Sequence, residues 1–247
     1  MAQPTRCIHQ NLLDEDIEPI SVRSIREANL TEEYLRPFLD GPPQPIGIAA
    51  AYSESDSRLV VLAIANESKV LLVEFYSSKP NRNGGGKSTK PRDTTGRTLL
   101  QDKLFCRPLG DLVAFDFQEI ALSLYSDHGG LRLVNGIDIQ AACCRGNRQP
   151  LASIKLAVGD EVTIYKDNVC DLFENMGYDP KRTSEIALRA WLAQHLLQYS
   201  TMEETFAKAK RINTQKLPGM VSVHINCNLS PQSNRPRDPR FLGEDQP

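Results

Sequence analysis

Short apolar runs separated by polar turns dominate the first half of the chain. The runs at 45–52, 58–65 and 69–76 read PIGIAAAY, RLVVLAIA and KVLLVEFY, and only SESDS and NES divide them. Their length, their β-branched residues and the short polar breaks predict a meander of three strands. Both faces of these strands are apolar, so helices are expected to cover the sheet on both sides.

The pattern then alternates between helices and strands. It predicts a helix at 98–105, a fourth strand at 111–115, a helix at 117–127 and a fifth strand within 133–142. The remainder is helical, at about 179–199 and 202–212, with Asp179-Pro180 as N-cap and N1 of the first of these helices. The predicted fold class is therefore α/β, with a mixed five-stranded sheet flanked by helices.

The two ends of the chain lack this alternation. Residues 1–20 are expected to be loosely ordered, and 21–40 to form short helical pieces that end at Gly41-Pro42-Pro43. The proline-rich polar end is typical of a disordered or partner-binding tail. The predicted divisions are an N-terminal extension with short helices (1–43), the α/β domain (44–216) and an extended or disordered C-terminal tail (217–247).

Composition excludes some classes of protein without selecting one. The 247 residues carry a formal net charge of −2, which argues against a globally basic nucleic-acid coat. No apolar run reaches the roughly 18 residues of a membrane span, and the N-terminus lacks the apolar core of a signal peptide. A nuclear or cytoplasmic protein is expected, neither secreted nor in a membrane. The six cysteines contain no CxxC pair and are interpreted as reduced thiols without a zinc site.

A basic segment follows the meander and contains Gly86-Lys87-Ser88. A phosphate-binding loop needs a glycine where Asn81 stands, and Pro91 would break the helix that must follow. The segment is therefore expected to be a solvated loop or a weak contact for an RNA backbone. Its candidate nucleic-acid contacts are Lys79, Arg82, Lys87, Lys90, Arg92 and Arg97.

The order of elements over about 45–200 is that of the ribonuclease H-like fold. Residues 112–142, LVAFDFQEIALSLYSDHGGLRLVNGIDIQAA, resemble the second motif of the DEDD-type 3′-to-5′ exonucleases, the RNase D and DnaQ-like relatives. The resemblance implies a ribonuclease H-like sheet and four carboxylates that hold two metal ions about 3.5–4 Å apart. Such ions need hard oxygen ligands.

The positions that match the family's metal ligands hold no acids. Ala49 and Ala51 take the acidic places of the first motif, and Ile120 takes that of the catalytic aspartate of the second. The late helix that matches the third motif contains no acid between Glu185 and Glu203. No catalytic residue, metal or cofactor is therefore expected at these positions.

Three nearby acids have another interpretation. Asp116 and Glu119 have capping-box spacing at the start of the helix at 117–127, so Asp116 is predicted to be an N-cap. Asp138 is predicted to bond backbone amides near the sheet edge. The alternative is a displaced site for Mg²⁺ or Mn²⁺ built from Asp116, Glu119 and Asp138, which must then converge.

The aromatic and histidine residues suggest no further chemistry. His128 is expected in a solvated loop, and His195 is expected to be packed or half-buried on the late helix. Trp191, the only tryptophan, is expected in the core.

The sequence thus favours a pseudo-exonuclease, which acts as a binding or scaffold subunit in an RNA-processing or RNA-silencing complex. The resemblance implies protein partners, and the tail is the expected docking segment. One alternative is an active metal-dependent 3′-to-5′ exoribonuclease with the displaced carboxylate site. A third hypothesis is RNA binding without hydrolysis through the basic segment.

Overall fold

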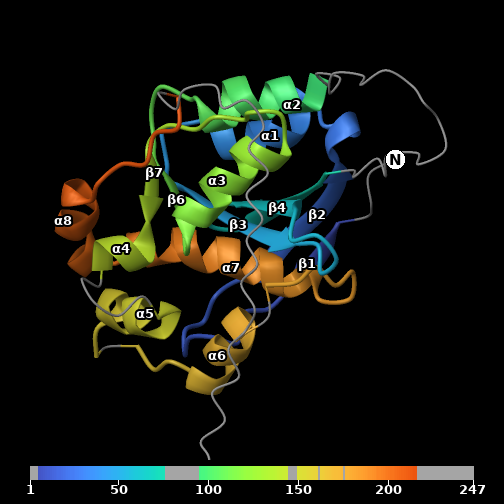
Figure 1. Cartoon of the computed structure of the whole chain (residues 1–247). Coiled ribbons are helices and arrows are strands. Elements are labelled where there is room, and N and C mark those ends of the chain that lie inside the picture. Colours follow the sequence, from blue (N-terminus) through green and yellow to red (C-terminus); the bar gives the residue numbers. More distant parts are fainter. Residues whose placement is uncertain (1–4, 76–94, 144–148, 161, 175, 216–247) are drawn as a thin grey trace, which may run out of the picture. The chain divides into compact units, whose positions relative to one another are not determined.

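A seven-stranded mixed sheet forms the centre of the computed structural model (Figure 1), which describes residues 5–75, 95–143, 149–160, 162–174 and 176–215. The strand order is β1-β2-β5-β4-β3-β6-β7. The strands are β1 (Arg6–Ile8), β2 (Ile20–Arg26), β3 (Ile46–Tyr52), β4 (Leu59–Ala65), β5 (Lys69–Glu74), β6 (Leu112–Ala114) and β7 (Gly136–Asp138).

The five predicted strands are all present, and their directions make the sheet mixed. The meander β3-β4-β5 is antiparallel, whereas β6 and β7 follow β3 in parallel. The predicted α/β class and the ribonuclease H-like order of elements are confirmed. The carboxyl ends of β3, β6 and β7 consequently lie at one edge of the sheet.

The sheet has seven strands and not the five predicted. The two additional strands, β1 and β2, come from the N-terminal segment. β2 pairs in parallel with β5, and β1 pairs antiparallel with β2. The expected helical structure at 21–26 was therefore incorrect, as was loose order at Arg6–Ile8. Ile20, Val22 and Ile25 are buried, so pairing with β5 and burial of these side chains outweigh the weak local preference.

Helices cover both faces of the sheet (Figure 1). The α-helices are α1 (Glu32–Leu39), α2 (Thr95–Leu99), α3 (Phe117–Asp127), α4 (Ile139–Cys143), α5 (Pro150–Val158), α6 (Lys166–Glu174), α7 (Thr183–His195) and α8 (Ser200–Lys208). A π-helix (Leu100–Phe105) continues α2, and 3₁₀ turns lie at Glu27–Asn29 and Leu196–Gln198. In the part of the chain described, no helix has the length and apolar character needed to cross a membrane.

The structure differs from the predicted boundaries of the last two helices. Asp179 does not cap the late helix, because α7 begins at Thr183. The Asp179 carboxylate instead accepts a hydrogen bond from the Lys181 amide at 2.8 Å and forms a local turn. The last helix ends at Lys208, which frees Ile212 to pair with Gly136 beside β7.

A helix backbone approaches the sheet closely at Gly47 of β3. A Cβ atom added there would lie 1.9 Å from the carbonyl oxygen of Ala190 in α7. Only glycine permits this distance, because every other residue would overlap with helix backbone. Trp191 lies fully buried in the same layer and donates its indole N–H to the Glu67 carbonyl at 3.1 Å, which confirms its predicted core position.

Gly47→Ala should destabilise the protein by about 3 kcal/mol or more, because α7 must move away from β3 to admit the methyl group. Urea denaturation of the full chain measures the change. Gln118→Ala on the exposed side of α3 is the control and should stay within about 0.5 kcal/mol. A Gly47→Ala protein as stable as the control would contradict the close packing.

Candidate functional site

The edge at which β3, β6 and β7 end is the candidate site, because ligands of open α/β sheets bind beyond the carboxyl ends of parallel strands. Each strand delivers residues of interest there. β3 ends at Tyr52, β6 leads into Phe115 and Asp116, and β7 ends at Asp138.

Buried apolar side chains occupy the positions that match the family's metal ligands. Ala49 is 6% exposed and Ala51 fully buried, and both pack in the core layer that contains α7. Ile120 of α3 is 2% exposed and packs in the layer on the opposite face. None of these three side chains can ligate a metal.

The backbone carbonyl of Asp116, and not its side chain, makes the first hydrogen bonds of α3. Asp116 has left-handed dihedral angles, φ 51° and ψ 39°, and its side chain makes no capping hydrogen bond. Its carbonyl oxygen accepts hydrogen bonds from the amides of Glu119 at 3.0 Å and Ile120 at 3.3 Å. Asp116 is the N-cap residue of α3, as predicted, but the predicted side-chain capping box was wrong. In a capping box the Glu119 side chain would accept a hydrogen bond from the Asp116 amide. That amide instead donates to Oε1 of Gln140 at 2.7 Å.

Asp138 bonds a backbone amide, as predicted. Its Oδ1 accepts a hydrogen bond from the Ala141 amide at 2.9 Å, and the side chain is buried at the start of α4. This carboxylate therefore has a structural partner that accounts for its burial.

The convergence that a displaced metal site needs is absent from the described residues. Asp116, Glu119 and Asp138 all belong to these residues, among which no group of three or more histidine, cysteine or acidic side chains can hold a metal ion. The donor set at this edge does not fit a pair of metal ions.

A buried guanidinium from α7 lies near this edge, and no pattern in the sequence indicates it. Arg189 is 2% exposed and donates from Nη1 to Sδ of Met176, while its Nε has no hydrogen-bond partner. Burial lowers the pKa of Arg189 to about 10, against the opposing effect of Glu185 and Tyr52. The helix on which the family carries acids thus contributes a buried cation.

Backbone from a later segment continues the sheet at the end of β3. The Tyr52 amide donates to the Met176 carbonyl at 3.2 Å, and the Tyr178 amide donates to the Tyr52 carbonyl at 2.7 Å. Burial raises the pKa of the Tyr52 phenol, and the charge of Glu119 raises it further. Phe115 and Phe173 of α6 meet edge to face, with ring centroids 4.7 Å apart. These contacts bring the segment at 176–178 against the end of β3, and Phe173 of α6 against Phe115.

Arg97, one of the predicted nucleic-acid contacts, is paired with an acid in the structure. Its Nε and Nη2 donate to the two carboxylate oxygens of Glu27 at 2.9 and 3.1 Å, and only 17% of its side chain is exposed. A guanidinium held in this way faces a carboxylate instead of solvent. The other five predicted contacts, Lys79, Arg82, Lys87, Lys90 and Arg92, lie outside the described residues.

His128 was wrongly predicted to lie in solvent. Its ring is buried, stacks on Phe75 with centroids 4.0 Å apart, and bonds the Leu59 carbonyl through Nε2 at 2.8 Å. Burial lowers its pKa. His195 is half-buried as predicted, against Trp191 and 2.9 Å from the Glu15 carboxylate.

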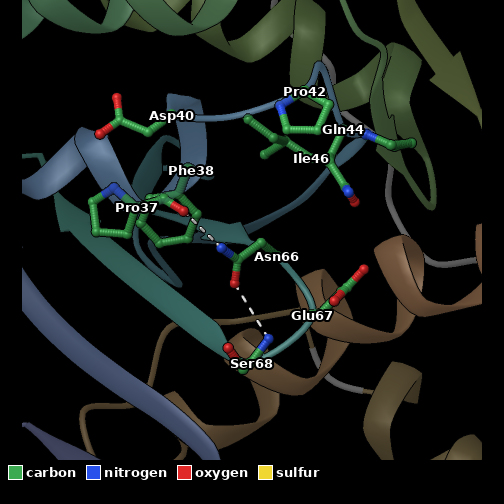
Figure 2. Close-up of a pocket in the computed structure, with 10 residues that line it drawn as sticks. Pro37, Phe38, Asp40, Pro42, Gln44, Ile46, Asn66, Glu67 and Ser68 are labelled. Atoms are coloured by element: carbon green, nitrogen blue, oxygen red, sulfur yellow. Dashed lines mark hydrogen bonds between the residues drawn. The ribbon is translucent and has the colours of Figure 1, made fainter.

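Two surface hollows have linings that contain none of the residues Tyr52, Phe115, Asp116 and Asp138 at the strand ends of the candidate site. Figure 2 shows one of about 190 Å³ beside α1 and the turn between β4 and β5, where Asn66 bonds Pro37 and Ser68. A second of about 390 Å³ lies between the N-terminal segment and the helices α6 and α7.

Comparison with known proteins gives a distant likeness. No family model matches the chain, and no curated protein matches it. Among solved structures, the EXD2 exonuclease domain soaked in Mg and GMP is 23% identical, with 82% of this chain and 98% of that chain covered and a TM-score of 0.33. The same domain soaked in Mn and Mg is 20% identical over 82% and 99%, with a TM-score of 0.34. At these sequence identities and TM-scores, the likeness identifies neither functional residues nor an activity in this chain.

Removing the Asp138 carboxylate should lower the free energy of unfolding by about 1 kcal/mol, because Asp138→Ala leaves the Ala141 amide without its side-chain acceptor. Asp116→Asn should change stability by less than about 0.5 kcal/mol, since asparagine tolerates left-handed angles and no side-chain cap is lost. Urea denaturation of both variants tests this, and equal losses would contradict the assigned roles.

His128 should make the protein less stable in mild acid. Its folded pKa lies below its unfolded value, so the unfolded state binds more protons as the pH falls through that value. The free energy of unfolding should therefore fall from pH 7 to pH 5, and His128→Gln should flatten the fall. His9→Gln, at an exposed position, is the control and should leave the slope unchanged. Identical slopes for all three proteins would show that His128 is not the titrating group.

Proposed function

We propose that this chain is a catalytically inactive 3′-to-5′ exonuclease-like protein that acts as a protein-binding and RNA-binding scaffold. The observation that carries the proposal is the burial of apolar side chains at Ala49, Ala51 and Ile120. These are the positions at which the family resemblance implies metal-binding carboxylates.

Electrostatics supports the loss of the metal site. Two metal ions need several carboxylates that share them, because each ion carries two positive charges into a confined space. Near the end of β3, this chain has the buried cation Arg189. A buried guanidinium would repel a metal ion in its vicinity.

The closed end of β3 also supports a non-catalytic role. The backbone of 176–178 pairs with Tyr52 through two hydrogen bonds, and Phe173 packs on Phe115. A working exonuclease must bring the last phosphodiester of its substrate to this edge. Protein atoms fill part of that space here.

The proposed setting is an RNA-processing or RNA-silencing complex, which the family resemblance suggests. The tail at 217–247 is the proposed docking segment for a protein partner, and Lys79, Arg82, Lys87, Lys90 and Arg92 are the proposed contacts for an RNA backbone. Arg97 is left out of this set because it pairs with Glu27.

The first experiment combines metal binding with RNA cleavage. The full chain is titrated calorimetrically with Mg²⁺ and with Mn²⁺, while a 5′-labelled single-stranded RNA is followed on a denaturing gel. We expect no heat of site-specific binding and no stepwise shortening. Metal binding together with shortening would overturn the proposal in favour of an active metal-dependent exoribonuclease.

Two controls make the outcome decisive. An active exonuclease in the same buffer must shorten the RNA. If this chain also shortens it, the triple variant Asp116→Asn, Glu119→Gln and Asp138→Asn separates a displaced site from contamination. Activity lost in the variant would place the reaction at these carboxylates, whereas activity that persists would come from elsewhere.

A further inference from the structure

The two edges of the sheet differ in the described residues. At β7, the Gly136 amide donates to the Ile212 carbonyl at 3.0 Å, and the Ile212 amide returns a bond to Gly136 at 2.7 Å. At the other end, β1 pairs with β2 and no further described strand follows it. An edge strand of this kind presents amide and carbonyl groups along one side, which can pair with another extended chain.

The second hollow, of about 390 Å³, is continuous with this edge. The chain leaving β1, from Ile8 to Leu12, forms one wall, and helices α6 and α7 form the other. Leu12, Leu172 and Leu188 make its apolar lining. An extended chain paired with β1 would place alternate side chains on the side of this hollow.

The wall of the hollow is held in shape by its own hydrogen bonds. Oε1 of Gln10 accepts from the amides of Leu12 and Leu13 at 2.8 and 2.9 Å, and its Nε2 donates to the Leu13 carbonyl at 2.8 Å. Nδ2 of Asn168 in α6 donates to the Asn11 carbonyl at 2.7 Å and ties the wall to the helix. A preformed wall lowers the entropy cost of binding.

The polar lining of the hollow carries negative charge. Asp171 and Glu185 contribute two carboxylates, and no lysine or arginine lines the hollow among the described residues. Arg182 donates to Oε1 of Glu185 at 2.6 Å from outside the lining, and its charge also interacts with Asp171, so it offsets part of the charge of both carboxylates. The hollow therefore suits a basic group whose methylene chain can lie on leucine side chains.

We propose that β1 and this hollow form one docking groove for an extended peptide that carries a lysine or arginine. The peptide backbone pairs with Arg6–Ile8, and the basic side chain enters between Asp171 and Glu185. The inference rests on the protein-binding part of the proposed function and names the chemical kind of partner.

Selection from a phage-displayed library of random twelve-residue peptides on the full chain tests the groove. We expect enrichment of peptides with a lysine or arginine between β-branched residues. The enriched peptide, made synthetically, should bind Asp171→Asn/Glu185→Gln at least tenfold more weakly than the unmodified chain. Asp160→Asn/Glu203→Gln removes the same charge at exposed positions outside the lining, and should change the affinity less than twofold.

Hydrogen exchange distinguishes backbone pairing with β1 from charge attraction alone, because charge attraction would not slow amide exchange in β1. Peptide binding should slow amide exchange within Arg6–Ile8 at least tenfold, because backbone pairing buries donors there. Equal enrichment on the Asp171→Asn/Glu185→Gln protein, folded as shown by circular dichroism, would overturn the proposal, as would unchanged exchange at β1. Shortening of RNA by this chain would overturn the proposed lack of catalysis without changing the peptide-binding results. A failure of the proposed function can therefore be distinguished from a failure of the docking groove.

Discussion

The contact between β3 and α7 is the constraint on which the rest of this structure depends. Gly47 brings the helix backbone against the central strand, and Trp191 fills the same layer. Once α7 is fixed there, Arg189 is carried toward the end of β3 and Leu188 toward the N-terminal segment. Both the candidate site and the proposed docking groove therefore depend on one close approach of helix and sheet.

The edge of the sheet at the end of β3 contains buried apolar side chains and added backbone hydrogen bonds. Ala49 and Ala51 extend the core outward, and the segment at 176–178 adds backbone hydrogen bonds to the last residue of β3. Burial of apolar groups lowers the free energy of the folded state, whereas clustered carboxylates raise it in the absence of metal. This edge of the sheet can thus contribute to the stability of the folded state.

Hydrophobic periodicity predicted the five central strands and the burial of Trp191 because these depend on local pattern. It failed for β2, whose partner β5 lies far away in sequence and supplies the hydrogen bonds. The burial of His128 and the ion pair of Arg97 were missed for a similar reason, since Phe75 and Glu27 meet them only after folding. The spacing of Asp116 and Glu119 suggested a side-chain capping box. The left-handed backbone of Asp116 instead directs its amide to Gln140 of α4.

The position of Trp191 gives the chain a built-in optical reporter. Its indole is fully buried, hydrogen-bonded to the Glu67 carbonyl and stacked on His195 with centroids 4.6 Å apart. As the chain has a single tryptophan, its fluorescence comes from one place, the layer between α7 and the sheet. A shift in emission therefore reports the docking of α7 itself, without any label.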